Sequence, residues 1–226
     1  MALISLARCA LLAGLTGLAA CTTTALQSSA DAPDTADTLP AMRWDFRPEA
    51  ETWTAATLDA LEEHGTALSS TVPGDVDQFC PAYRTADTDQ RNAFWAGLFS
   101  ALAKHESTWN PRASGGGGLW LGLLQIDPRT ARGYGCKAKT AKALFNGADN
   151  LSCGVRIAAV QVARRGSINR GMRDWGPFHS SSKRAEMAAW TSKQDYCQIK
   201  AKPKPNVTAR LAALSATRPS KVVRQE

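Results

Sequence analysis

The sequence lacks the short motifs that identify several large classes of enzyme. It has only three histidines among 226 residues, and the segment HESTW (105–109) carries Trp109 where the zinc-protease motif HExxH requires its second histidine. No GxSxG or P-loop pattern occurs, and no CxxC pair or pair of neighbouring histidines offers a zinc site. These absences exclude a zinc protease of that type and predict a protein without a metal or a cofactor.

Long apolar runs are also absent beyond the N-terminus. The one such run, CALLAGLTGLAA, follows the weakly basic head MALISLAR and has about a dozen residues, too few to span a bilayer, so residues 1–20 are predicted to be a secretory signal peptide. It ends in LAAC, which resembles the lipobox of bacterial lipoproteins and implies that Cys21 becomes the lipid-bearing first residue. Thr22 follows Cys21, which by resemblance to Gram-negative sorting rules implies the periplasmic face of the outer membrane. The alternative is a plain signal peptide with a chance cysteine.

Charge is distributed unevenly along the chain. Residues 31–90 contain thirteen Asp and Glu against three Lys and Arg, whereas residues 91–226 contain seven against twenty-three. A basic surface suits an anionic partner, such as lipid headgroups or a cell-wall polymer that bears carboxylates. Nucleic acid is not expected as a partner, because the predicted signal peptide implies export and no basic helix has interleaved aromatic residues. An ordinary solvated basic face is the alternative.

Composition predicts one globular domain with tethers. Residues 21–47, rich in Thr, Ser, Ala, Asp and Pro, are expected to form a flexible acidic tether, and residues 48–77 an N-terminal helical extension. The domain itself is expected at 78–200 and a basic tail at 201–226.

Four cysteines remain once the signal peptide is removed and Cys21 is lipidated. An even number in an exported chain predicts two disulfides, for which three connectivities are possible. We expect Cys136 to pair with Cys153, closing a local loop, and Cys80 to pair with Cys197, joining the two ends of the domain. A zinc site is the competing interpretation.

The strongest helical pattern covers about 89–107. Asp87 and Gln90 can form a capping box at its start, and Pro111 predicts its end by about Asn110. One stripe of this helix is formed by residues spaced four, three and four apart, namely Trp95, Phe99, Leu102 and Glu106. Further helical patterns lie at 48–65, within 140–166 with Gly166 as a stop, and within 183–200.

Glu106 is the only glutamate between Glu63 and Glu186. Its place at a helix C-terminus, beside backbone carbonyls and apolar neighbours, predicts a raised pKa. It would then hold a proton near neutral pH and could deliver it to a leaving oxygen as a general acid. The alternative is a solvated boundary residue. The adjacent His105 points to another side of the helix and is expected to be exposed.

The segment from Glu106 onward resembles the lytic transglycosylase and goose-type lysozyme superfamily. That family has Glu-Ser, aromatic-Asn-Pro, a Gly-containing loop, Gly-Leu-Met-Gln with a hydrophobic residue and Pro nearby, and later Asn-hydrophobic-x-x-Gly. Here the matching elements are Glu106-Ser107, Trp109-Asn110-Pro111, Gly122-Leu123-Leu124-Gln125-Ile126, Pro128 and Asn150-Leu151-Ser152-Cys153-Gly154. The ordered match spans 106–154 and extends more loosely over roughly 80–195.

The resemblance implies a mainly α, lysozyme-like α+β fold, with a small irregular or β element after the catalytic helix. It implies peptidoglycan as the partner and cleavage of the bond between N-acetylmuramic acid and N-acetylglucosamine, with Glu106 as the sole acid and base. It places Gln125 along the substrate and Ser107 beside the site. Trp109 can stack on a sugar ring, as can Trp120, and packing is the alternative for both.

The sequence departs from the family pattern at two places. Leu124 replaces the usual methionine, a change that conserves volume. Near 165–185 there is no Ala-Tyr-Asn, where the family has a tyrosine that supports the glutamate. Trp175 or Phe178 can fill this space, although core packing is the preferred interpretation for both, or Tyr134 can reach the site from elsewhere.

Three hypotheses follow from the sequence. The first is a lipid-anchored lytic transglycosylase that leaves 1,6-anhydromuramoyl ends. The second is a muramidase that uses water in place of the sugar's C6 hydroxyl. The third is a catalytically weak or inactive lysozyme-like lipoprotein that binds the cell wall.

Overall fold

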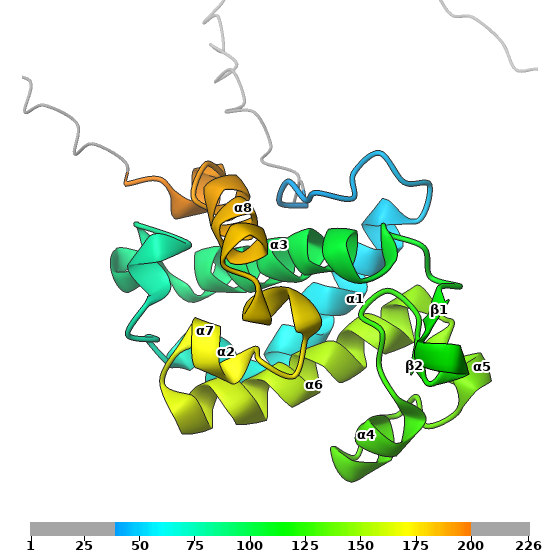
Figure 1. Cartoon of the computed structure of the whole chain (residues 1–226). Coiled ribbons are helices and arrows are strands. Elements are labelled where there is room, and N and C mark those ends of the chain that lie inside the picture. Colours follow the sequence, from blue (N-terminus) through cyan, green and yellow to red (C-terminus); the bar gives the residue numbers. More distant parts are fainter. Residues whose placement is uncertain (1–38, 200–226) are drawn as a thin grey trace, which may run out of the picture. The chain divides into compact units, whose positions relative to one another are not determined.

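Helices make up most of the structure, a computed structural model that describes residues 39–199 (Figure 1). The predicted signal peptide, Cys21, most of the predicted tether and the basic tail lie outside these residues. The α-helices are α1 (Ala50–Glu63), α2 (Thr66–Ser70), α3 (Thr88–Ser107), α4 (Pro128–Gly133), α5 (Ala141–Leu144), α6 (Gly147–Arg165), α7 (Ile168–Gly171) and α8 (Ser181–Thr191). Five 3-10 helices join them: η1 (Val76–Gln78), η2 (Tyr83–Thr85), η3 (Gly116–Gly118), η4 (Gly176–His179) and η5 (Asp195–Cys197). The strands β1 (Ser114–Gly115) and β2 (Trp120–Leu121) form one antiparallel hairpin. This mainly helical fold with a small β element confirms the expected fold class.

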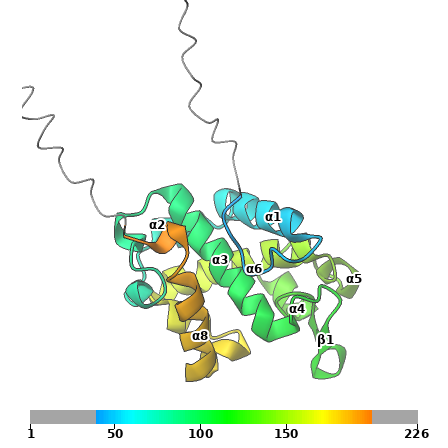
Figure 2. The same ribbon diagram turned by 90° about the horizontal axis from the view of Figure 1, so that it is seen from above.

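Helix α3 runs through the centre of the molecule, between α1 and α8 (Figure 2). It begins where predicted, because the Asp87 side chain accepts a hydrogen bond from the Gln90 N–H and the Gln90 side chain returns one to the Asp87 N–H. All twelve residues from Asn92 to Ala103 are buried. The single apolar stripe expected from the sequence is therefore too narrow a description, since α3 is enclosed on every side.

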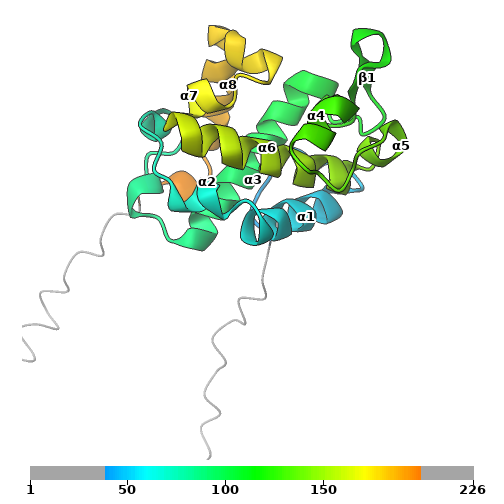
Figure 3. The ribbon, with the colours of Figure 1, turned by 90° about the horizontal axis from the view of Figure 1, so that it is seen from below.

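Helix α6 lies on the other side of α3 from α8 and contacts α1, α2 and α7 (Figures 1 and 3). It starts at an Asn146 side chain that accepts from the Asp149 N–H, and it stops at the predicted Gly166, whose φ of 60° is the left-handed conformation that glycine tolerates. Helix α1, within the segment expected as an N-terminal extension, packs through Trp53 and Leu61 into the same core. Residues 50–63 thus contribute to the interior that supports α3.

The hairpin and the short helices α4 and α5 gather at the end of the molecule where α3 finishes (Figures 1 and 3). This region connects α3 to α6. It places the segment after the candidate acid next to the start of α6, where the second part of the family motif lies. None of the helices in residues 39–199 has both the length and the apolar character needed to cross a membrane.

Two disulfides close this arrangement with the connectivity expected from the sequence. Cys136 joins Cys153 over 17 residues, linking the segment after α4 to α6. Cys80 joins Cys197 over 117 residues, linking the segment before α3 to η5 after α8. All four sulfur atoms belong to buried residues. The second bridge therefore fixes the two ends of the described domain to each other.

Candidate active site

Glu106 lies in the last turn of α3. The helix ends one residue later, because Thr108 and Trp109 both adopt left-handed backbone conformations, with φ of 51° and 55°. Their N–H groups donate to the last carbonyls of the helix, including that of Ala103 at 3.2 Å from the Trp109 nitrogen. This reversal comes before Pro111, so the helix ends earlier than proline alone would require.

The carboxyl group of Glu106 is held in a poorly solvated position. Its Oε1 atom is buried and has no hydrogen-bond partner. Burial raises the pKa of Glu106 from 4.5 to about 7, and the nearby Lys183 ammonium opposes this rise. An unpartnered buried polar atom together with a raised pKa makes this carboxyl a candidate functional group.

A buried asparagine holds the turn that follows the hairpin. Asn150, which has no solvent exposure, donates from Nδ2 to the carbonyls of Leu121 at 2.9 Å and Leu144 at 3.0 Å. Its Oδ1 accepts from the Leu124 N–H at 2.9 Å. All three contacts of this amide are made to backbone, so Asn150 ties the start of α6 to residues 121–124.

Two glycines of the motif allow residues 121–124 to pack closely against the start of α6. Gly122 has a φ of 76°, and a Cβ there would lie 2.2 Å from the Leu144 carbonyl oxygen and 2.4 Å from Asn150 Nδ2. A Cβ on Gly154 would lie 2.3 Å from Leu124 Cδ1. The family spacing thus has a local cause: Gly122 lets the turn approach Asn150, and Gly154 leaves room for Leu124 against α6.

Gln125 joins this turn to the hairpin. Its backbone is also left-handed, with φ of 49°, and its Nε2 donates to the carbonyls of Gly122 at 2.9 Å and Ala113 at 3.2 Å. A Cβ on Gly115 would lie 2.5 Å from Gln125 Oε1. The amide nitrogen is therefore used within the loop, and Oε1 of this half-buried residue is the side-chain atom left to accept a hydrogen bond from a substrate.

Ser107 and Trp109, both expected near the substrate, turn back onto α3. The Ser107 hydroxyl donates to the Ala103 carbonyl at 3.2 Å. The Trp109 indole N–H donates to the Ser100 carbonyl at 2.9 Å, and its ring meets Phe46 edge to face at 5.0 Å between centroids. Trp120 is different, because it remains 51% exposed on β2.

Tyr134 is not the hydroxyl partner of Glu106. Its oxygen accepts from Gln161 Nε2 and lies 3.5 Å from an Asp174 carboxylate oxygen, to which it donates. Throughout residues 39–199, no side-chain hydroxyl forms a hydrogen bond with the Glu106 carboxyl. The tyrosine missing from the family pattern therefore has no direct replacement in the part of the chain that the structure describes.

Trp175 and Phe178 lie in the stretch of sequence, 165–185, where that tyrosine was sought. Both are buried, and Trp175 packs edge to face on Phe99 with 6.4 Å between ring centroids. The Trp175 indole N–H donates to the Leu124 carbonyl at 3.0 Å. Core packing, the preferred interpretation for both, agrees with this environment, and Trp175 also holds the residue before Gln125.

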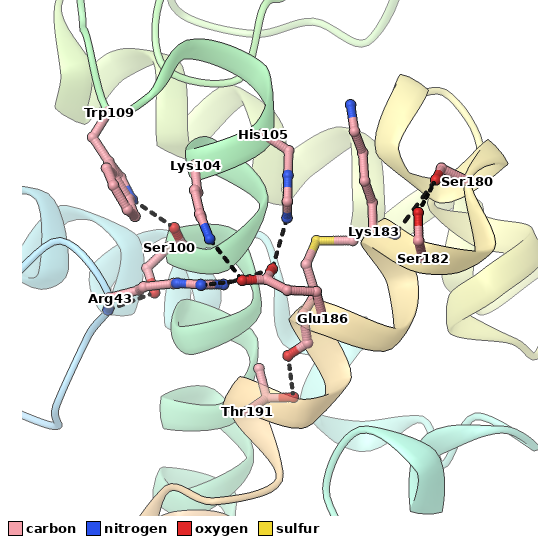
Figure 4. A network of polar contacts seen from close by, with 11 residues as sticks. Arg43, Ser100, Lys104, His105, Trp109, Ser180, Ser182, Lys183, Glu186 and Thr191 are labelled. Atoms are coloured by element: carbon pink, nitrogen blue, oxygen red, sulfur yellow. Dashed lines mark hydrogen bonds and ion pairs between the residues drawn. The ribbon is translucent and has the colours of Figure 1, made fainter.

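Sequence reasoning missed an ionic cluster beside the site. Glu186 on α8 accepts from Lys104 Nζ at 2.7 Å, lies 2.7 Å from His105 Nε2 and forms an ion pair with both terminal nitrogens of Arg43 (Figure 4). The Arg43 guanidinium, then Lys104 and His105, holds the pKa of Glu186 below its usual range. His105 is consequently not the exposed residue expected, since its side chain is only 14% accessible. The one available signal was that Glu186 is the next glutamate after Glu106.

A metal site is not formed by the residues described. No group of three or more His, Cys, Asp or Glu side chains within 39–199 is arranged to hold an ion. Asp127, the nearest downstream carboxylate in sequence, caps α4 through the Arg129 N–H at 2.7 Å, and its hydrogen bonds to Arg129 lower its pKa. Asp127 is thus engaged as a charged helix cap.

Comparison with known proteins agrees with this geometry. The transglycosylase SLT domain family model matches residues 85–169. The chain is also similar to three solved structures of Bd0314 DslA. One Glu-to-Gln mutant has 27% sequence identity and a TM-score of 0.65. A second Glu-to-Gln mutant and wild-type form 2 each have 26% sequence identity and a TM-score of 0.63. Each of these matches covers 71% of this chain and 100% of the DslA chain. A comparison with curated protein sequences finds no match. Residues 85–169 are therefore similar to the transglycosylase SLT domain, and the likeness to the DslA structures agrees with the mainly helical fold.

Proposed function

We propose that the protein is a peptidoglycan lytic transglycosylase with Glu106 as its sole acid and base. The protonated carboxyl gives its proton to the oxygen that links the muramoyl C1 to the N-acetylglucosamine unit, and the C1–O bond breaks. The resulting carboxylate then takes the proton of the muramoyl C6 hydroxyl, whose oxygen attacks C1. The products are a free N-acetylglucosamine hydroxyl and a 1,6-anhydromuramoyl end, and Glu106 regains its proton.

One observation carries this proposal: Glu106 offers a buried, unpartnered carboxyl oxygen and a pKa raised to about 7. A general acid works best when its pKa lies near the working pH, since it is then both populated in the acid form and able to transfer its proton. A carboxyl at 4.5 would be almost entirely ionised at neutral pH. Burial at the end of α3 therefore supports the role of acid, and the half-exposed position allows contact with a substrate.

The inventory of carboxylates favours a single-acid scheme. The usual two-carboxylate mechanism of glycosidases needs a second acidic group across the scissile bond. Asp127 is held by Arg129, and Asp174 is exposed and accepts a hydrogen bond from Tyr134. Both carboxylates are thus already engaged by neighbouring residues.

Digestion of purified sacculi tests the proposal. Wild-type protein should release soluble muropeptides, and Glu106→Gln should bind sacculi while losing release by a factor of about 100 or more, the scale expected when a general acid is removed. Glu62→Gln, an exposed residue of α1, is the matched control and should act like wild type. Undiminished release by Glu106→Gln would remove this residue from the mechanism.

A second candidate function rests on the missing hydroxyl partner. Because no side-chain hydroxyl in residues 39–199 forms a hydrogen bond with the Glu106 carboxyl, the protein fits a lysozyme-like cell-wall-binding role with weak or no turnover as well. Wild-type protein that binds sacculi but releases no muropeptide would favour this role. Release that depends on Glu106 would exclude it.

We also propose that the protein acts while anchored through Cys21 to the periplasmic face of the outer membrane. The LAAC sequence ending at Cys21, followed by Thr22, supports this location. Peptidoglycan then lies within reach of the acidic tether, and the basic character of the domain suits an anionic polymer. Metabolic labelling with a fatty acid should mark the wild type and fail to mark Cys21→Ser.

A further inference from the structure

Helix α8 is fastened to the last turn of α3 by the ionic cluster of Glu186. The carboxylate contacts Lys104 and His105, which directly precede the candidate acid, and it binds Arg43 from the segment before α1 (Figure 4). The Arg43 backbone N–H also donates to Ser100 Oγ at 3.0 Å. Three separate segments are thus joined at this point, and the first turn of α8 is held in a fixed relation to Glu106.

Lys183 lies three residues before Glu186, one turn earlier on α8. Residues spaced by three lie on one face of a helix, so Lys183 shares the face of α8 from which Glu186 contacts Lys104 and His105. Figure 4 shows the Lys183 side chain extending alongside the last turn of α3, with its ammonium end joined to none of the residues drawn. The Lys183 charge also lowers the pKa of Glu106, which agrees with this placement.

Lys183 differs from the other cations around the site because it is exposed and, within residues 39–199, forms no ion pair. Lys104 and Arg43 are both engaged by Glu186. Arg184, the next residue on α8, donates to the Phe178 carbonyl at 2.6 Å. One cation next to the candidate acid is therefore left to meet a ligand.

We propose that Lys183 binds a carboxylate of the glycan substrate beside the bond that Glu106 cleaves, and so acts as a specificity-determining residue. This inference rests on the proposed function. A lysine ammonium is a compact, hydrated point charge that pairs with anionic groups without demanding one geometry. The muramoyl unit supplies such groups in two forms: the carboxylates of its peptide stem and, once the stem is removed, the carboxylate of its lactyl group.

Binding experiments in the Glu106→Gln background test this inference without cleavage of the probe. Three probes are compared on the full chain: glycan strands with intact stems, amidase-treated strands that retain only the lactyl carboxylate, and neutral chitooligosaccharides. Lys183→Gln is the test variant, and Lys183→Arg retains the charge. Lys193→Gln is the matched control, since Lys193 is an exposed lysine just beyond the other end of α8.

Lys183→Gln should weaken binding of an anionic probe by roughly two- to fivefold, the effect of losing one exposed ion pair, and leave chitooligosaccharide binding unchanged. Lys183→Arg should restore most of the affinity, and Lys193→Gln should lose none. A loss confined to strands with intact stems assigns the contact to the stem, and a loss on both anionic probes assigns it to the position nearest the sugar.

The inference is overturned if Lys183→Gln weakens all three probes equally, or none. Its failure is distinguishable from failure of the proposed function. Release of muropeptides that depends on Glu106, together with no selective effect at Lys183, would refute this inference alone. A selective effect at Lys183 in a protein that releases no muropeptide would support the binding site and refute the enzymatic activity.

Discussion

The environment of Glu106 predicts a pH-dependent cost to stability that Glu106→Gln removes. In the folded protein the pKa of Glu106 is about 7, against 4.5 for an ordinary glutamate. Between these values the folded state binds more protons at this site than the unfolded state, so the free energy of unfolding falls as the pH rises from 4.5 to 7. Below 4.5 both states are protonated and the site contributes nothing. Above 7 the full cost of a buried carboxylate is present.

The magnitude follows from the same shift. A pKa change from 4.5 to about 7 corresponds to about 3.4 kcal/mol, and residual contact with solvent reduces the expected effect to about 2 kcal/mol. A glutamine keeps the shape of the side chain but does not titrate. Glu106→Gln should therefore match wild type near pH 4 and exceed its stability by about 2 kcal/mol at pH 8.

Urea unfolding between pH 4 and 8.5, followed by tryptophan fluorescence and circular dichroism, measures this difference without any substrate. Glu62→Gln controls for the loss of one carboxylate at an exposed position. A constant stability difference between Glu106→Gln and wild type at all pH values would refute the reasoning. So would a variant that is less stable than wild type at pH 8, because the carboxylate would then have a stabilising partner.

Other predictions concern the parts that position the site. Glu186→Gln should lower the free energy of unfolding by about 1 kcal/mol at pH 7, since it removes the one carboxylate from a cluster of cations. The deficit should shrink as the pH falls below the ordinary pKa of a glutamate, because the unfolded chain then takes up a proton at Glu186 while the folded protein does not. Urea titrations at pH 7 and pH 3 measure this deficit, and an unchanged value would contradict the assignment. Gly122→Ala should lower the free energy of unfolding by about 3 kcal/mol or more, because its Cβ would lie 2.2 Å from the Leu144 carbonyl oxygen. Gly117 has a similar φ but open space around it, so Gly117→Ala should lower the free energy of unfolding by only about 1 kcal/mol. Equal losses of stability on thermal unfolding would show that the close approach at Gly122 is unimportant. Gly133→Ala, within α4 and free of contacts, should raise stability by about 0.5 to 1 kcal/mol in the same assay.

Features encoded by neighbouring residues were predictable from the sequence. The capping box at Asp87 and Gln90 and the glycine stop at Gly166 depend on side chains within a turn of the helix end, so α3 starts and α6 stops where expected. The pairing of Cys136 with Cys153 was favoured by its short loop. The position of Glu106 at the end of α3 follows from the same local reasoning.

Features that depend on distant contacts were not predictable. The left-handed conformations of Thr108 and Trp109 have no local signal, since neither is glycine or asparagine, and they are secured when the Trp109 indole binds Ser100 and packs on Phe46. The ionic cluster of Glu186 likewise joins segments as far apart as 143 residues. Periodicity alone cannot reveal such a contact.

The motif residues occupy an intermediate position between these cases. The family pattern marks Gly122, Asn150 and Gly154, but only the structure shows that all three shape one turn. It also shows that the amide nitrogen of Gln125 donates hydrogen bonds to backbone carbonyls at that turn and at the hairpin. A pattern identifies which residues matter, whereas the contacts identify which of them build the site and which remain to meet a substrate.

Mass spectrometry of peptidoglycan digested in ¹⁸O-labelled water tests the central claim most directly. If Glu106 directs attack by the muramoyl C6 hydroxyl, the released fragments carry 1,6-anhydromuramoyl ends, are one water lighter than hydrolysis products and contain no label, and Glu106→Gln releases none of them. Fragments with labelled reducing muramoyl ends and no anhydro species would contradict the account and identify a hydrolase instead.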